Sequence, residues 1–342
     1  MEPLPLVSVL LPIRNEAGFI ERSLGAILAQ DYPAERMEVL VVDGMSEDGT
    51  RETVQGMLAG VPGARMVDNP RLLASAALNI GLTEARGEVV VRVDGHTIIA
   101  PDYVRRCVEV LVETGADCAG GLMQAEGTTP MGEAIALATS SPFGIGGSRF
   151  HYSAEAQDAE TVYLGAWPAE VLRTHGPFQE DVGCNEDDEF NYRLRAAGGH
   201  IWLDPSIRSV YYCRPDLGSL WRQYFRYGYW KVRVFQKVPD SAQLRHWVPP
   251  LFALAVVGGL LVALLVPVLR TVYLTGLALY LLADLVASAA IAQRAGWRHL
   301  WRLLVVFPSL HLAYGLGYWA GILRFGPPWR REGQHGQAGQ HG

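Results

Sequence analysis

Three long apolar runs near the C-terminus constrain the fold of this chain more than any other feature. Residues 247–269 contain no charge, residues 272–292 are interrupted only by Asp284, and residues 303–323 form the third run. Each run is long enough for a helix that crosses about 30 Å of hydrocarbon. The pattern predicts a membrane domain in residues 246–325 with two to three transmembrane helices. The third run is either a span or a re-entrant or interfacial segment.

Asp284 is a costly residue within a predicted span. It is therefore either functional or hydrogen-bonded inside the helix bundle.

The charged residues are divided unevenly along the chain. Residues 244–342 hold eight Arg and two acidic residues, whereas residues 1–243 hold 21 basic and 33 acidic residues. Such an acidic front part argues against a nucleic-acid partner, because that binding depends on clustered basic groups. With the front part in the cytoplasm, most arginines that flank the apolar runs fall inside, as the positive-inside rule prefers. We therefore expect a multi-pass protein of the inner (cytoplasmic) membrane, although Arg324, Arg330 and Arg331 would lie outside if the third run spans.

Residues 217–238 interleave seven aromatic residues with five Arg or Lys. This mixture is typical of a helix that lies in a membrane interface. Nucleic-acid binding is the competing interpretation, and the apolar runs that follow disfavour it. We predict an amphipathic interfacial helix region in residues 217–245. The Gly-, Gln- and His-rich tail, residues 326–342, is predicted to be disordered.

Short apolar runs alternate with helical stretches in the front domain, residues 1–216. The predicted strands of its first part are 7–11, 37–42, 64–67 and 88–93. This alternation predicts the α/β class, with a Rossmann-like, mainly parallel sheet covered by helices on both faces. Ligands of such sheets bind at the carboxyl ends of strands. Asp43 and Asp94 stand directly after two of these strands.

The chain after Asp94 is less regular. Strands are predicted at 117–121, 161–164 and 201–203, and Asp204-Pro205 closes the last one, because proline cannot donate to a sheet. Residues 140–160 are polar and glycine-rich. They form either a mobile substrate lid or a plain surface loop.

Four carboxylates crowd the start of a predicted helix within residues 183–194. Asn185 is a good N-cap, and residues 186–189, all acidic, fill the first turn, where backbone N–H groups and the helix dipole favour negative charge. Phe190 and Leu194 give the helix one apolar face. Taken alone, this acidic tip is more typical of a well-capped helix than of a site. The other motifs of the chain must decide between capping and catalysis.

Five segments, in this order, resemble motifs of the family 2 glycosyltransferases of the GT-A fold, and within them the succinoglycan-type bacterial polysaccharide enzymes. The segments are 7–16, 41–50, 92–96, 186–193 and 223–227. One such motif is weak evidence, whereas five in order are strong. The resemblance covers residues 6–238, and the apolar runs that follow suit it.

The resemblance implies an inverting transfer from a nucleotide diphosphate sugar, a UDP-sugar, to a lipid-linked saccharide. Asp43 would hydrogen-bond the uracil base. The remaining residues implied to bind the nucleotide sugar are Pro12, Asn15, Glu16, Arg92 and Asp94.

Asp94 and His96 occupy the two ends of the family's Asp-x-Asp metal motif. The histidine departs from the common pattern. A Mn²⁺ site tolerates imidazole better than a Mg²⁺ site, which prefers oxygen. The resemblance thus implies a divalent metal, Mn²⁺ or Mg²⁺, at Asp94, whereas His96 either ligates the metal or contacts the diphosphate.

Asp187 is implied to be the general base, with Glu186 and Asp188 as neighbours that shape its field. Gln223 and Arg226 would bind the donor diphosphate or the acceptor at the membrane surface. Tyr227 stands where the family's Gln-x-x-Arg-Trp motif has its final aromatic. Trp167 either stacks on an acceptor sugar or belongs to the core.

The implied acceptor is a polyprenyl-linked saccharide at the cytoplasmic face of the lipid bilayer, in the synthesis of an exopolysaccharide or another surface glycan. Export or polymerisation machinery is a possible partner. Two alternatives stay open: a synthase that glycosylates a polyprenyl phosphate directly, and a non-catalytic nucleotide-binding scaffold of an export assembly. A processive synthase is disfavoured, because three or fewer spans leave little room for a channel.

Overall fold

The computed structural model describes residues 4–329 and contains two compact units. Within the described residues, the first unit consists of residues 4–124 and 149–212, and the second of residues 125–148 and 213–329. Most of the tail that the sequence predicts to be disordered, residues 330–342, lies outside the described residues.

One nine-stranded sheet forms the centre of the first unit, in the order β3-β2-β1-β4-β8-β6-β9-β5, with β7 paired to β9. The parallel strands at one side are β3 (Ala64–Asp68), β2 (Met37–Asp43), β1 (Val7–Ile13) and β4 (Val89–Arg92). The others are β8 (Tyr163–Pro168), β6 (Cys118–Glu126), β9 (Ile201–Tyr212), β5 (Thr97–Ile99) and β7 (Gln157–Asp158). β8 pairs with β4 and β6 in antiparallel fashion, and β9 does so with β5 and β7. The predicted α/β class with a Rossmann-like sheet is thus confirmed.

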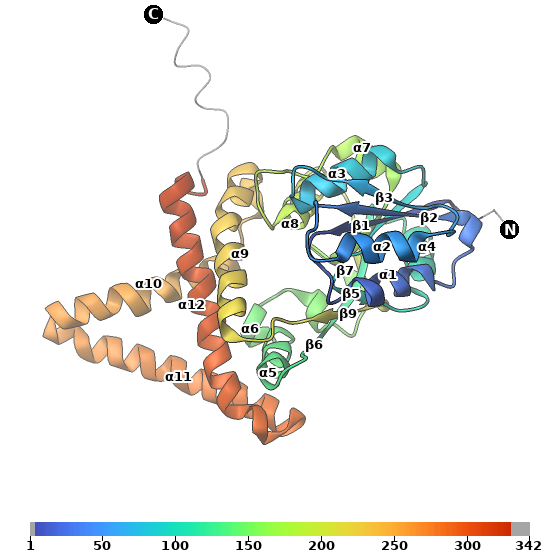
Figure 1. Cartoon of the computed structure of the whole chain (residues 1–342). Helices are drawn as coiled ribbons and strands as arrows, with labels where there is room; N and C mark the ends of the chain where they lie inside the picture. The colour runs from blue at the N-terminus through green and yellow to red at the C-terminus, as the bar shows by residue number, and fades with distance from the viewer. Residues whose placement is uncertain (1–3, 330–342) are drawn as a thin grey trace, which may run out of the picture. The chain divides into compact units, whose positions relative to one another are not determined.

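Helices cover both faces of this sheet (Figure 1). On one face lie α1 (Ile20–Leu28), α2 (Thr50–Leu58) and α4 (Tyr103–Thr114), and on the other α3 (Ala74–Glu84), α7 (Ala169–His175) and α8 (Glu186–Ala196). Successive β1 residues supply the two cores, because Val9 and Leu11 pack on the α1 side and Leu10 on the α3 side. Strands buried on both faces need apolar residues at every position. This explains the continuous apolar runs of the sequence.

The parallel pairing brings the carboxyl ends of three strands to one edge. Ile13 at the end of β1 pairs with Asp43 at the end of β2, and β4 lies on the other side of β1. Asp94 follows β4 by two residues. The two aspartates that the sequence places after strands therefore share one edge of the sheet, where such folds bind ligands.

Pro205 does not end a strand, which corrects one prediction. β9 continues through it to Tyr212. Its first residues, Trp202 and Leu203, pair with β7, whereas residues 209–211 pair with β5. Pro205 lies between these two pairings, so its missing N–H removes no hydrogen bond to β5 or β7.

Residues 140–160 hold more regular structure than the sequence suggested. They include α6 (Pro142–Ile145), where the Ser141 hydroxyl accepts a hydrogen bond from Gly144 N at 3.2 Å. Residues up to 148 belong to the second unit and later ones to the first. Whether this segment is a lid or a surface loop stays a prediction.

The second unit is helical. Its helices are α5 (Pro130–Thr139), α6, α9 (Leu217–Lys237), α10 (Leu244–Leu265), α11 (Pro267–Ala295) and α12 (Leu300–Phe325). α10, α11 and the segment Trp297–Phe325 are long and apolar enough to cross a membrane. The third apolar run therefore forms a helix of spanning length.

Glycines let α9 and α12 approach closely, and the two helices run side by side in Figure 1. A methyl group on Gly228 of α9 would overlap the Tyr314 carbonyl. A methyl group on Gly317 of α12 would likewise overlap the Phe225 carbonyl. Small residues at helix interfaces have this effect in membranes, where van der Waals packing drives association.

Two polar residues of the second unit, Asp284 and His311, make hydrogen bonds within it. The buried Asp284 accepts a hydrogen bond from Ser288 at 3.0 Å, one turn further along α11. On α12, His311 contacts the Tyr280 hydroxyl and the Phe143 carbonyl, each at 2.9 Å. The Asp284 bond lies within α11, so the two alternatives for this residue, a function or a hydrogen bond inside the bundle, stay predictions.

Candidate active site

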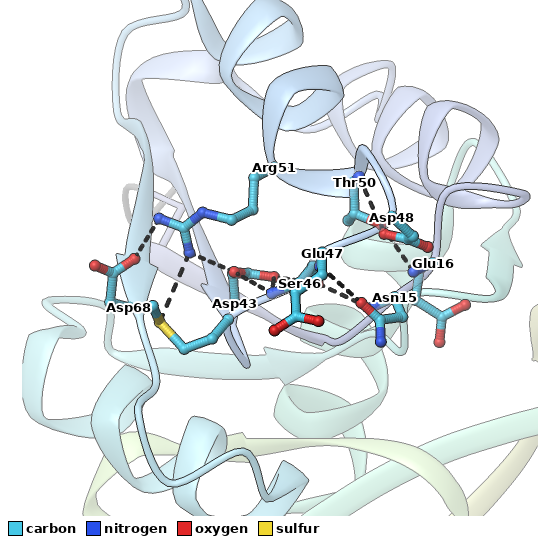
Figure 2. A network of polar contacts seen from close by, with 10 residues as sticks. Asn15, Glu16, Asp43, Ser46, Glu47, Asp48, Thr50, Arg51 and Asp68 are labelled. Atoms are coloured by element: carbon cyan, nitrogen blue, oxygen red, sulfur yellow. Dashed lines mark hydrogen bonds and ion pairs between the residues drawn. The ribbon is translucent and has the colours of Figure 1, made fainter.

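The loops after β1 and β2 are tied together by backbone and side-chain hydrogen bonds (Figure 2). Asn15 N donates to the Ser46 hydroxyl at 2.8 Å, and its Oδ1 accepts from Glu47 N at 3.0 Å. Asn15 has φ = 56°, a conformation that asparagine tolerates better than most residues. Glu16 N donates to the Thr50 hydroxyl at 2.9 Å. The predicted nucleotide residues Asn15 and Glu16 are thus held in a fixed loop.

Asp43 is fully buried at the end of β2, and both of its carboxylate oxygens have partners. Oδ1 accepts from the Ser46 hydroxyl at 2.5 Å and Oδ2 from Arg51 Nη1 at 2.5 Å (Figure 2). The same guanidinium binds Asp68 at 2.7 Å. Ser46 N also donates to Oδ2 at 3.1 Å and lies 3.4 Å from Oδ1, so a ligand N–H at Asp43 would have to share or replace one of these hydrogen bonds. Pro12 pairs with Val42, next to Asp43 in the sheet.

Arg51 is a contributor that sequence reasoning missed. It lies in the first turn of α2, eight positions after Asp43. The signal was an arginine in the first turn of the helix that follows a buried acidic strand end. Such a buried carboxylate requires a charged or hydrogen-bonding partner.

Arg92 joins two predicted parts of the site that are far apart in the sequence. Its Nε donates to Asp94 Oδ1 at 2.8 Å and its Nη2 to Glu186 Oε1 at 3.0 Å. The arginine side chain is 8% exposed and that of Glu186 is 4% exposed. The strand end that carries Asp94 and the acidic tip of α8 therefore lie side by side in the first unit.

Asp187 is half-buried at the first turn of α8, and its Oδ1 accepts a hydrogen bond from Asp188 N at 2.8 Å. Burial, and then the negative charges of Asp188 and Glu186, raise the pKa of Asp187 to about 7, while Arg92 opposes the rise. A carboxylate with such a pKa can accept a proton near neutral pH, as a general base must.

Glu189 plays a different part from the other acidic residues of the tip. It is 1% exposed and pairs with Arg193, one turn later, at 2.9 Å. Arg193 Nη2 also donates to the Pro177 carbonyl at 2.9 Å. Asn185 holds the N-cap position, but its side chain makes no capping hydrogen bond. The tip is therefore anchored by Glu189 and Arg193.

His96 and Asp94 are candidate metal ligands, and their surroundings bear on the fit. Within residues 4–329 no group of three or more His, Cys, Asp or Glu side chains could hold a metal ion. His96 Nδ1 lies 2.9 Å from Glu16 Oε1, and a carboxylate in this position orients an imidazole that binds metal. Mg²⁺ and its analogues commonly take one or two protein ligands and complete their shell with phosphate oxygens and water. Asp94 supplies the carboxylate of such a site, and the imidazole of His96 suits Mn²⁺ better than Mg²⁺.

The remaining predicted residues are Trp167, Gln223 and Arg226. Trp167 is 2% exposed and packs against Phe178 and Phe190, with ring centroids 6.1 and 6.0 Å away, which favours the core alternative over sugar stacking. Gln223 and Arg226 lie on α9 in the second unit, where Gln223 donates to the Tyr227 hydroxyl at 3.0 Å.

The comparisons with known proteins agree on the family. The sequence profile of Glycosyl transferase family 2 matches residues 8–138. Succinoglycan biosynthesis protein ExoA of Rhizobium meliloti (strain 1021) is 31% identical over 321 residues, 93% of this chain and 95% of that protein. The dolichyl N-acetyl-alpha-D-glucosaminyl phosphate 3-beta-D-2,3-diacetamido-2,3-dideoxy-beta-D-glucuronosyltransferase of Methanococcus voltae is 26% identical over 239 residues, 68% of this chain and 74% of that protein.

A solved structure shares the fold. It is the mannosyltransferase PcManGT from Pyrobaculum calidifontis in complex with GDP-Man and Mn²⁺. The similarity covers 92% of this chain and 88% of that chain, with a TM-score of 0.59 and 23% sequence identity. The predicted GT-A fold followed by apolar helices is thus confirmed.

Proposed function

This chain belongs to the family 2 glycosyltransferases, and we propose that it transfers a sugar from a UDP-sugar to a lipid-linked saccharide with inversion at the anomeric carbon. The observation that carries the proposal is the contact of Arg92 with both Asp94 and Glu186, at 2.8 and 3.0 Å. This contact joins the strand end expected to bind the donor diphosphate to the helix tip expected to activate the acceptor. A transfer reaction needs both groups in one site.

The donor nucleotide is proposed to bind along the carboxyl ends of β1 and β2. Asp43, fixed by Ser46 and Arg51, offers a buried oxygen acceptor to the N–H of a uracil ring. Asn15 and Glu16 edge the same loop pair. A carboxylate at this position accepts from a base N–H and repels a base that presents only an acceptor there, which favours uracil.

Asp94 and His96 would hold a divalent cation together with the donor diphosphate. Bound there, the cation would stabilise the negative charge that develops on the leaving diphosphate. Glu16 would keep the His96 ring oriented through its contact at 2.9 Å. The solved structure of PcManGT is a complex with GDP-Man and Mn²⁺, which supports a divalent cation in this fold.

Asp187 is proposed to act as the general base. Its carboxylate takes the proton of an acceptor hydroxyl while that oxygen bonds to the anomeric carbon. The bond from the anomeric carbon to the diphosphate breaks, and its electron pair leaves with the diphosphate oxygen. One displacement of this kind inverts the anomeric configuration. The raised pKa of Asp187 supports this role, since a base works best when its pKa lies near the working pH.

The acceptor is proposed to be a polyprenyl-linked saccharide of a bacterial exopolysaccharide or another surface glycan. Three helices able to cross a membrane support an acceptor that sits in the bilayer. The names of the relatives, succinoglycan biosynthesis and transfer to a dolichyl-linked sugar, point the same way. Gln223 and Arg226 on α9 are proposed to bind the donor diphosphate or the acceptor at the membrane surface.

Turnover by the full chain in detergent tests the proposal. The protein is incubated with a panel of UDP- and GDP-sugars, with Mn²⁺ or Mg²⁺, and with a polyprenyl diphosphate saccharide or a polyprenyl phosphate. We expect UDP release and a labelled saccharide lipid, with the new linkage inverted by NMR. Labelling of polyprenyl phosphate instead would identify the direct synthase.

The variant Asp187→Asn distinguishes a glycosyltransferase from a non-catalytic nucleotide-binding scaffold. If the chain is the enzyme, we expect this variant to lower kcat by at least about 100-fold. Glu170→Gln is the matched control, because Glu170 is a 77% exposed carboxylate on α7 of the same unit. Nucleotide binding without turnover in the wild-type chain, unchanged in Asp187→Asn, would support the scaffold and refute the enzyme.

A further inference from the structure

Arg92 divides its hydrogen bonds unequally between two carboxylates. Two of its nitrogens face Asp94, with Nε at 2.8 Å from Oδ1 and Nη2 at 3.4 Å from Oδ2. Only Nη2 reaches Glu186, at 3.0 Å from Oε1. The guanidinium thus holds Asp94 with a fork and Glu186 with a single bond, although arginine can form a two-bond fork with either carboxylate.

The unused atoms of the Arg92–Glu186 pair complement each other. Among the described residues, Arg92 Nη1 and Glu186 Oε2 are both buried and have no hydrogen-bond partner. One is a donor and the other an acceptor, and they belong to the two side chains that already share one bond. Buried polar atoms without partners are costly and call for an explanation. A rotation of the guanidinium that brought Nη1 to Glu186 Oε2 would satisfy both atoms in one fork.

Asp94 is the partner that prevents this rotation. Asp94 is also the residue proposed to bind the cation, and a guanidinium and a metal ion on one carboxylate repel each other and compete for it. Once Asp94 is neutralised by a cation, the attraction of Arg92 to Glu186 and Asp187 is no longer opposed. The same event would therefore free Asp94 and complete the fork to Glu186.

We propose that Arg92 is a positioning residue that occupies Asp94 while no cation is bound there and turns its guanidinium to Glu186 when one is. Loading of the donor side then fixes Glu186, and with it the acidic tip of α8 that carries the proposed base. The inference rests on the proposed function and deepens it, because it assigns Arg92 a role between the two halves of the site in place of direct contact with the nucleotide sugar.

Binding of Mn²⁺ tests this without turnover. The full chain in detergent is titrated with Mn²⁺ while EPR measures the free ion, first alone and then with UDP. Arg92→Met removes the guanidinium that competes for Asp94, so we expect the Kd for Mn²⁺ to fall about tenfold. Glu186→Gln weakens the attraction of Arg92 to residue 186, so Arg92 stays paired with Asp94. We therefore expect the Kd for Mn²⁺ to rise severalfold. In the Arg92→Met background, Glu186→Gln should have a smaller effect, because Glu186 acts through Arg92.

Arg65→Met is the matched control. Arg65 forms ion pairs with Glu38 at 3.2 Å and Glu84 at 3.5 Å in the same unit, and its loss should leave Mn²⁺ binding unchanged. Arg92→Lys keeps the charge without the fork and should give an intermediate Kd. If Arg92→Met does not fold, Arg92→Lys and Glu186→Gln together test the inference.

An equal or higher Kd for Mn²⁺ in Arg92→Met overturns the inference, because an arginine that binds the diphosphate or only supports the fold gives that result. If neither the wild-type chain nor any variant binds Mn²⁺ in the presence of UDP, the cation part of the proposed function fails, and the inference fails with it.

Discussion

Asn79 on α3 pairs with the backbone of Phe178 as a neighbouring strand would. Its Oδ1 accepts from Phe178 N and its Nδ2 donates to Phe178 O, both at 2.9 Å. Phe178 is buried and begins the segment that leads to the acidic tip of α8. The helix that packs behind β1 and β2 therefore also holds the approach to the proposed base.

Asn79→Ala should leave both Phe178 groups without a partner, at a cost of about 1–3 kcal/mol for each buried group. We expect a lower Tm and a kcat/KM reduced about tenfold, because a loosened tip misplaces Asp187. Asn79→Asp keeps the acceptor for Phe178 N and should fall between alanine and wild type. Differential scanning fluorimetry and turnover measure the two effects, and wild-type values for Asn79→Ala would show that the pairing does not position the tip.

The activity should depend on pH through Asp187. A base must be ionised, and the pKa of Asp187 is raised to about 7 by burial and by the charges of Asp188 and Glu186. We therefore expect kcat/KM to rise with pH through a midpoint near 7. Asp188→Asn removes the larger of the two neighbouring charges and should move the midpoint to lower pH. A midpoint that stays in place would mean that another group controls the profile.

The same shift makes Asp187 a source of instability at neutral pH and above. Its folded-state pKa is raised above the usual value near 3.8, so the folded chain binds this proton more tightly than the unfolded chain. The free energy of unfolding must then fall as the pH rises from about 4 to 7. Asp187→Asn should raise Tm by a few degrees at pH 8 and leave it nearly unchanged at pH 4. Equal shifts at both pH values would contradict this linkage.

The sequence predicted the buried strands well, because a continuous run of apolar residues fits few other structures. The continuously apolar runs identified β1, β2 and β4, because strands buried on both faces admit few polar residues. Asp43 and Asp94 could therefore be placed at one edge of the sheet. Helix α5 was overlooked, although Thr129 followed by Pro130 is a capping signature, and Thr129 does accept from Gly132 N at 2.9 Å.

Contacts between distant parts of the chain could not be predicted in the same way. Arg92 and Glu186 are 94 positions apart, and their ion pair depends on how the strands between them return to the sheet. Trp167 illustrates the same limit. A tryptophan after a Gly-Ala pair suits a sugar platform or a core equally well, and only the packing of Phe178 and Phe190 around it decides between them.

His96→Asp should change which cation the chain prefers. The variant restores a second oxygen ligand two residues after Asp94, and Mg²⁺ prefers oxygen ligands more strongly than Mn²⁺ does. We expect the ratio of turnover in Mg²⁺ to turnover in Mn²⁺ to rise severalfold. Glu16→Gln is the companion variant. It weakens the contact to His96 Nδ1 at 2.9 Å and should lower Mn²⁺ affinity without changing the preference. An unchanged ratio in His96→Asp would indicate that residue 96 contacts the diphosphate instead.

Gly317→Ala should separate α9 from α12. A methyl group at Gly317 would overlap the backbone carbonyl of Phe225, which cannot move without shifting the whole helix. Overpacking of this kind costs about 1–3 kcal/mol, so we expect a lower Tm in detergent. Gly276→Ala is the matched control on α11, where a methyl group would meet no atom within 4 Å, and it should be neutral or slightly stabilising. If both variants melt alike, the glycine contacts do not hold these two helices together.

If Gly317→Ala alone is destabilised and also loses turnover, then the position of α9, with Gln223 and Arg226 on it, matters for the reaction as well as for the fold.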